Sequence, residues 1–193
     1  MPADTAEPPL IPRSAIPGCL IVTGVPGAGK TTITTMIARR FDRSARLDGD
    51  TVNEMIVSGG VGVDQLPDPD AQAQLLLRAR NLCSLADNFD DDGFLPVIDH
   101  VIPDRAVLEF MLSELTVRPV HLVVLAPRPE VAWERNVGRP ADERVLLDLE
   151  PLQASMQAEL ADVGWWIDSS DQTPEGTVEL LIREVTRHGV VSR

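Results

Sequence analysis

Gly24-Val25-Pro26-Gly27-Ala28-Gly29-Lys30-Thr31 contains a glycine, four further residues and then Gly-Lys-Thr. This is the spacing of a phosphate-binding P-loop, in which glycines let backbone N–H groups point at phosphate oxygens. An apolar run at residues 19–22 precedes the loop, and apolar residues at helical spacing follow it. Because the motif requires a strand before it and a helix after it, the stretch predicts nucleotide binding in an α/β fold rather than a plain glycine-rich turn.

The P-loop residues have distinct expected roles. We expect Lys30 to reach the β- and γ-phosphates and the Thr31 hydroxyl to ligate Mg²⁺. Further nucleotide contacts are expected from the remaining loop residues and the first helical turn, namely Gly24, Val25, Pro26, Gly27, Ala28, Gly29 and Thr32. The expected cofactors are therefore ATP and Mg²⁺.

Length and composition suit one domain. The chain has 193 residues, of which 44% are hydrophobic and 24% charged. A formal charge of −13 argues against general binding to nucleic acid or anionic membranes. The two cysteines match no disulfide or metal framework, which favours a reducing cytoplasmic setting. Residues 1–18 are rich in proline and are expected to be a flexible tail without the features of a secretory signal, followed by a single domain over residues 19–193.

Strand-like and helix-like segments alternate along the rest of the chain. Strands are expected at residues 19–22, 44–47, 94–99, 120–125 and 165–168, and helices after the P-loop and near residues 51–56, 70–89, 104–115, 130–136, 145–160 and 174–188. This alternation predicts a three-layer α/β P-loop NTPase fold with a parallel sheet of about five strands and a short helical lid near residues 128–145. Ligands of such sheets bind beyond the carboxyl ends of the strands.

Two aspartates are expected at those strand ends. Asp50 follows the second strand and is our first choice for the carboxylate that accepts the proton of an acceptor hydroxyl. The alternative is that Asp48 or Asp50 only caps the next helix. Asp99 ends the third strand and is expected to hold Mg²⁺ or to contact the substrate.

Other polar residues are candidates for the acceptor pocket. Asn53 follows Asp50, and His100 follows Asp99, although a single histidine at a strand end is often a structural residue. Arg105 either faces the same pocket or faces solvent.

A calcium-binding EF-hand loop is a rival interpretation of the acidic stretch Asn88, Asp90, Asp92, Gly93 and Asp99, but Pro96 and the apolar residues after it indicate a strand where a second helix would begin. A solvated acidic turn fits better.

Arginines gather after the fourth expected strand, at positions 128, 135, 139 and 144. In a lid, Arg135 and Arg139 would stabilise the charge on the transferring phosphate, and Arg144 is a further candidate. The alternative is a solvated helix end that pairs with nearby acidic residues. Ser169, after the last strand, lies where backbone groups are expected to hold the adenine base.

The P-loop, the Asp50 turn, the end of the strand at Asp99, the arginine segment and residues 167–170, taken together, resemble the chloramphenicol phosphotransferase-like branch of small P-loop kinases. The resemblance covers most of residues 19–188, and gluconate kinases and zeta-toxin kinases are similar in plan. It implies that Asp50 activates a substrate hydroxyl and that Arg135 and Arg139 belong to the lid. The chain departs from chloramphenicol phosphotransferase at His100, where that family has a second aspartate, so the resemblance does not imply chloramphenicol as the acceptor.

These features favour one reaction class. We expect Mg²⁺-dependent transfer of the ATP γ-phosphate to a hydroxyl of a small molecule, such as an antibiotic, a sugar or a related metabolite. One alternative is a kinase that phosphorylates nucleic acid ends, which the acidic charge disfavours. Another is a nucleotide-dependent switch or partner-binding ATPase in which the γ-phosphate orders a loop.

Overall fold

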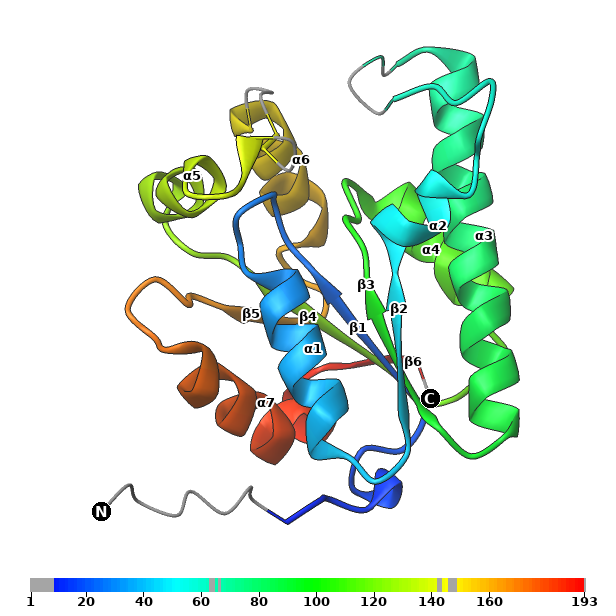
Figure 1. Ribbon diagram of the computed structural model, residues 1–193, viewed down its shortest axis with the longest axis vertical. Coiled ribbons are helices and arrows are strands. Elements are labelled where there is room, and N and C mark those ends of the chain that lie inside the picture. The colour runs from blue at the N-terminus through cyan, green and yellow to red at the C-terminus, as the bar shows by residue number, and fades with distance from the viewer. Residues whose placement is uncertain (1–8, 63–64, 66, 142–143, 146–148, 193) are drawn as a thin grey trace.

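A twisted, mostly parallel sheet forms the centre of the molecule (Figure 1). The structure is a computed structural model that describes residues 9–62, 65, 67–141, 144–145 and 149–192. The parallel strands lie in the order β2-β3-β1-β4-β5. Their bounds are Cys19–Thr23 (β1), Ser44–Asp48 (β2), Leu95–Asp99 (β3), Val120–Leu125 (β4) and Trp165–Ile167 (β5). The predicted five-stranded parallel sheet is therefore confirmed, and the structure adds an antiparallel strand, Val190–Ser192 (β6), beside β4.

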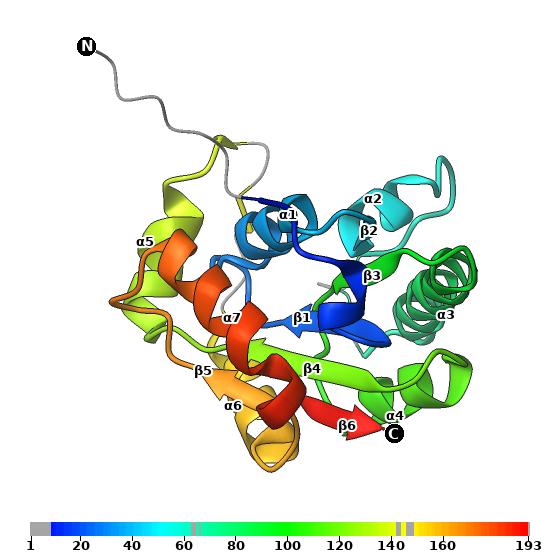
Figure 2. The same ribbon diagram turned by 90° about the horizontal axis from the view of Figure 1, so that it is seen from below.

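Helices cover both faces of the sheet, as the three-layer prediction requires (Figure 2). α1 and α7 pack together on one face, while α3, α4 and α6 lie on the other. The helices are Lys30–Arg40 (α1), Gly49–Glu54 (α2), Pro69–Asp91 (α3), Arg105–Glu114 (α4), Pro129–Val137 (α5), Glu150–Leu160 (α6) and Pro174–His188 (α7). None of the helices in the described residues is long and apolar enough to cross a membrane.

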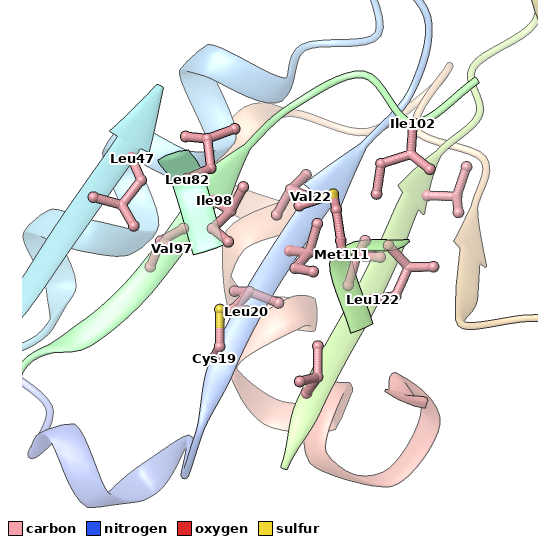
Figure 3. Packing of buried hydrophobic residues seen from close by; sticks show 14 of the residues in the cluster. Cys19, Leu20, Val22, Leu47, Leu82, Val97, Ile98, Ile102, Met111 and Leu122 are labelled. Atoms are coloured by element: carbon pink, nitrogen blue, oxygen red, sulfur yellow. The ribbon is translucent and has the colours of Figure 1, made fainter. Parts of the chain in front are cut away.

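The central strands are buried on both faces. Every residue of β1 and β4 is buried, which explains why both read as nearly continuous apolar runs instead of alternating patterns. Figure 3 shows Leu20 and Val22 of β1 beside Leu122 of β4 and Met111 of α4. Burying one such aliphatic side chain contributes about 1.5–3 kcal/mol, so these contacts hold β1, and the loop that follows it, in place.

The folded part of the chain begins before Cys19. Ile16 is fully buried, and the backbone of Ile11 forms an isolated bridge with Phe41. Arg13 begins a short 3-10 helix, Arg13–Ala15, and pairs with Asp90 on α3. The expected flexible tail over residues 1–18 is therefore wrong for residues 11–18, because an apolar anchor and an ion pair attach them to the domain. Residues 1–8 lie outside the described residues.

The P-loop, α2 and α5 lie at the carboxyl ends of the strands (Figure 1). The P-loop leaves β1 between α5 on one side and α2 on the other (Figure 1). The expected helix at residues 145–160 begins only at Glu150, after the lid connection. Asp50 does not end a strand: β2 ends at Asp48, and Asp50 lies in the first turn of α2.

Candidate active site

The P-loop is shaped by three glycines with positive φ. Gly24, Gly27 and Gly29 have φ values of 149°, 83° and 98°, which side chains rarely adopt. A Cβ atom on Gly27 would lie 2.1 Å from the carbonyl oxygen of Ala132 on α5. A Cβ on Gly29 would meet nothing within 4 Å, so the backbone there faces open space. The loop thus packs against the lid helix at one glycine and leaves room for a ligand at another, which fits a phosphate cradle.

Lys30 is held inside the loop. Its side chain is 8% exposed, and Nζ donates hydrogen bonds to the carbonyl oxygens of Gly24 at 3.0 Å and Val25 at 3.2 Å. Burial lowers the pKa of Lys30, while the charges of Asp99 and Asp50 act in the opposite direction. Lys30, Asp50 and Asp99, all named from the sequence, therefore lie close enough to interact electrostatically.

A cavity of about 360 Å³ lies between the P-loop, the lid helix and the segment after β5. Seven residues expected to contact the nucleotide or the transferring phosphate line it: Gly27, Ala28, Gly29, Thr32, Arg135, Arg139 and Ser169. Four further lining residues were not named as candidates from the sequence, because no motif marks them individually: Ile33, Gln172, Pro174 and Thr177. The Ser169 side chain is 5% exposed and its hydroxyl oxygen has no hydrogen-bond partner, so the cavity offers a ligand one unsatisfied polar group.

The lid helix α5 is tied to both sides of this cavity. Arg135 donates from Nη2 to the carbonyl oxygen of Ser169 at 3.0 Å. Asn136 is fully buried and bonds both backbone groups of Val145, which holds the connection after α5. Sequence reasoning passed over Asn136 because a single amide carries no pattern.

Arg144 and Arg128 have other partners. Arg144 is exposed and donates to the carbonyl oxygen of Arg139 at 2.8 Å, so its contact in the structure is with the lid backbone. Arg128 forms a two-pronged pair with Asp171 and a longer one with Glu130, in agreement with the solvated alternative for that residue. Positions 142 and 143 lie outside the described residues.

Asp48, and not Asp50, caps the helix that follows β2. Asp48 is the N-cap of α2, and its side chain accepts a hydrogen bond from the backbone N–H of Asp50 at 3.0 Å. Asp50 itself is exposed in the first turn. Because Asp48 already caps the helix, the Asp50 carboxylate is available to a ligand.

Asp99 lies in a buried charged network. It is 4% exposed, and its Oδ2 accepts from Arg46 at 2.8 Å and from Thr34 at 3.2 Å. Arg46 also pairs with Asp48 at 2.9 Å, which links the ends of β2 and β3. Asp99 is thus a restrained carboxylate one strand away from the P-loop, and its expected contact with Mg²⁺ must coexist with Arg46. Sequence reasoning missed Arg46, although a charge inside a predicted strand is a usable signal.

His100 is a neutral, buried side chain. It is 3% exposed, and its Nε2 has no hydrogen-bond partner in the described residues. Burial, together with the nearby charges of Arg78 and Lys30, lowers its pKa to about 3. It therefore stays uncharged near neutral pH, and it lies beside Gly49 at the start of α2.

Gly49 makes room for that imidazole, and its replacement is expected to destabilise the protein. In Gly49→Ala, the new Cβ would lie 2.6 Å from Nδ1 of His100 and 3.2 Å from the carbonyl oxygen of Asp99. Such crowding costs about 1–3 kcal/mol of unfolding free energy, to be measured by urea denaturation. Gly60→Ala is the control, because its nearest neighbour would be 3.7 Å away. Equal stability of the two variants would contradict this packing.

The burial of His100 also predicts a pH dependence of stability. Its pKa is about 3 in the folded chain against an ordinary value of 6.5. Between these values the unfolded chain binds a proton that the folded chain does not, so the unfolding free energy falls as pH falls, by up to about 1.4 kcal/mol per pH unit. Urea denaturation between pH 7 and pH 5 should show a shallower slope in His100→Gln than in the wild type. Equal slopes in the two proteins would refute the assignment.

Arg78 and Arg105 have defined partners in the structure. Arg78 of α3 donates from Nη2 to Oδ1 of Asn53 at 2.6 Å, which links α3 to the helix that carries Asp50, α2. Arg105 instead pairs with Asp162, and its backbone N–H donates to Glu159 of α6. These contacts direct Arg105 toward α6, in agreement with the solvent-facing alternative for that residue and not with a place in the acceptor pocket.

The EF-hand interpretation is wrong. Asn88 and Asp90 continue α3, and Asp99 ends a buried strand, so these residues do not form one loop. Within the described ranges, no group of three or more His, Cys, Asp or Glu side chains could hold a metal ion. A P-loop Mg²⁺ site is different in kind, because it draws on a threonine hydroxyl, a carboxylate and phosphate oxygens.

Comparison with solved structures identifies the fold. A sugar kinase from Janibacter sp. HTCC2649 superposes with a TM-score of 0.67 at 22% identity, over 87% of this chain and 94% of that one. A gluconokinase from Sinorhizobium meliloti 1021 gives 0.61 at 20% identity, over 89% and 93%. The tunicamycin resistance protein of Deinococcus radiodurans gives 0.65 at 15% identity, over 92% and 100%. The chain has the fold of the small P-loop kinases.

Sequence comparison alone does not reveal this relationship. No protein-family model and no curated protein sequence matches the chain. At identities of 22% and below, these likenesses show the shared fold alone. The roles of individual side chains must be argued from the site itself.

Proposed function

We propose that this protein transfers the γ-phosphate of ATP to a hydroxyl group of a small molecule. The observation that carries the proposal is the position of Asp50: an exposed carboxylate, not needed for capping, within electrostatic reach of the P-loop lysine. A nucleotide-binding loop alone would support an ATPase or a switch equally well. A carboxylate within electrostatic reach of Lys30 can in addition accept the proton of an acceptor hydroxyl, which only a kinase needs.

The nucleotide side of the proposed site is assigned as follows. The base occupies the cavity beside Ser169, and the phosphates lie on the backbone N–H groups of the P-loop with Lys30 at the β- and γ-phosphates. Arg135 and Arg139 line the same cavity from the lid and would stabilise charge on the transferring phosphoryl group. Mg²⁺, held through the Thr31 hydroxyl with Asp99 nearby, would supply neutralisation of phosphate charge.

The transfer step uses Asp50 as the base. The acceptor hydroxyl lies against the Asp50 carboxylate, and its oxygen forms a bond to the γ-phosphorus as the bond from that phosphorus to the β,γ-bridging oxygen breaks. The hydroxyl proton passes to Asp50, and ADP leaves with the bridging oxygen. Lys30 and the lid arginines hold the charge that moves during this exchange.

The cytoplasm is the compartment that we propose for this reaction. Cys19 and Cys83 are both buried free thiols, with no disulfide between them. Burial raises the pKa of each thiol, which makes both unreactive. A chain with two protected thiols suits the reducing cytoplasm, where ATP is also available.

The proposal is tested by acceptor screening. The purified protein is incubated with ATP, Mg²⁺ and a panel of hydroxyl compounds, comprising sugars, hydroxy acids and antibiotics, and products are detected by mass spectrometry as a gain of one phosphate. Transfer to at least one compound above the rate of ATP hydrolysis in buffer supports the proposal. Nucleotide binding with no transfer to any compound, but with nucleotide-dependent binding of a protein partner, would replace it with the switch alternative.

A further inference from the structure

Arg78 is a half-buried cation that forms no ion pair in the described part of the chain. Its Nη2 donates to the neutral amide oxygen of Asn53, and its Nε is buried with no hydrogen-bond partner. Within the described ranges, no carboxylate lies within ion-pair distance of its guanidinium, although the chain has 30 acidic residues. Arg80, two residues further along α3, shows the ordinary arrangement, because it is more exposed and pairs with Glu114.

A half-buried guanidinium destabilises the protein unless a hydrogen-bond acceptor or a negative charge replaces the water that it has lost. Burial lowers the pKa of Arg78, with the charge of Asp50 acting in the opposite direction. A guanidinium that is partly withdrawn from water loses hydration energy, and a buried N–H without an acceptor adds to that loss. An anionic ligand group would compensate for the lost hydration and would give the buried N–H an acceptor, because a carboxylate can accept two parallel hydrogen bonds from one guanidinium.

The neighbours of Arg78 place it on the acceptor side of the site. Asn53, the partner of Arg78, lies three residues after Asp50 on α2, and His100 lies beside Gly49 at the start of the same helix. The charge of Asp50 acts to raise the pKa of both Arg78 and Lys30, which agrees with Asp50 lying near both cations. Asn53 holds one Nη atom of Arg78, which fixes the guanidinium on the α2 side of α3.

From this arrangement we propose that the acceptor is a hydroxy acid, and that Arg78 binds its carboxylate while the hydroxyl faces Asp50. This inference rests on the proposed function, since it names the class of the acceptor in that reaction. His100, buried and neutral, adds a hydrogen-bonding group beside the bound acid without adding charge. The same guanidinium could accept a phosphate ester in place of a carboxylate, so the test includes both.

Binding is measured first, by NMR, independently of turnover. Protein labelled with ¹⁵N is loaded with Mg²⁺ and a non-hydrolysable ATP analogue, and the Nε–H signals of Arg78 and Arg80 are assigned from Arg78→Lys and Arg80→Lys. It is then titrated with D-gluconate and D-glycerate, with the matched alcohols D-glucitol and glycerol, and with glycerol 3-phosphate. The two acids should shift the Arg78 signal, whereas the alcohols should not, and Arg80 should be unaffected throughout.

Kinetics then tests the consequence for selectivity. The wild type should phosphorylate hydroxy acids with kcat/KM at least about tenfold above the matched alcohols, and Arg78→Gln should raise KM for the acid about 10- to 100-fold with a smaller effect on kcat. Arg78→Lys should recover part of the loss, because it keeps the charge but not the two-pronged geometry. Arg80→Gln should behave as the wild type, and circular dichroism checks that each variant is folded.

Three results would overturn the inference. These are an Arg78 signal that neither acid shifts, a shift caused only by glycerol 3-phosphate, and equal turnover of acids and alcohols by the wild type. Each of them leaves the phosphotransferase proposal intact if some hydroxyl compound is phosphorylated. Failure of that broader proposal is recognised separately, by the absence of transfer to every compound in the screen.

Discussion

Replacing Lys30 with methionine is expected to reduce phosphoryl transfer by at least about 100- to 1000-fold. Methionine keeps most of the length and the apolar contacts of the buried side chain but removes the charge that would face the β- and γ-phosphates. The carbonyl oxygens of Gly24 and Val25 would also lose the donor that they share in the structure. The rate of product formation with an acceptor from the screen measures the effect, with ADP binding followed in parallel.

Arg39→Met is the matched control for this variant. Arg39 is an exposed cation in the last turn of the same helix, α1, so its loss should change the rate by less than about twofold. Lys30 is also the only lysine in the sequence. An amine-directed reagent that modifies a lysine therefore reports on this site, and ATP should protect it. Activity of Lys30→Met within tenfold of the wild type would contradict the assigned role.

The sequence predicted those parts of the fold that depend on uninterrupted local patterns. β4 has the bounds expected from its run of apolar residues, and α7 has those expected from its helical spacing and the proline at its start. β6 was missed because Val190–Ser192 is only three residues long and depends on pairing with β4. A strand of that length carries too little local signal to be distinguished from a loop.

The site was harder to predict than the fold, because it depends on which strands are neighbours. Asp48 and Asp99 are opposite each other in the register of β2 and β3, and Arg46 joins them from the same edge. Arg78 is brought to the acceptor side by the packing of α2 on α3. Neither arginine belongs to a motif, so their positions follow only from tertiary structure.

Local geometry settled a choice that the sequence left open. The sequence offered both Asp48 and Asp50 as caps for the helix that follows β2. In the structure the cap is Asp48, whose carboxylate accepts from the backbone N–H of Asp50. The distinction depends on where β2 ends, and strand ends are the least certain part of any pattern-based prediction.

Replacing Asp50 with asparagine is expected to lower kcat by about 10² to 10⁴ while leaving ATP binding unchanged. Asparagine has nearly the same shape and still forms hydrogen bonds, but its amide cannot accept the acceptor's proton. The helix should survive, because capping is provided by Asp48 and the Asp50 side chain is exposed. Single-turnover rates at saturating acceptor, together with calorimetric ATP binding, separate the chemical step from binding.

Glu54→Gln is the matched control for this prediction. Glu54 is an exposed acid at the other end of the same short helix, so it tests the loss of one negative charge on α2 without touching the first turn. Its rate should stay within about twofold of the wild type. If Asp50→Asn kept full transfer, Asp50 could not be the base. A second replacement, Asp50→Glu, adds a direct check on position: it keeps the carboxylate but moves it by one methylene, so partial activity above that of Asp50→Asn is the outcome required of a base whose placement against Lys30 matters.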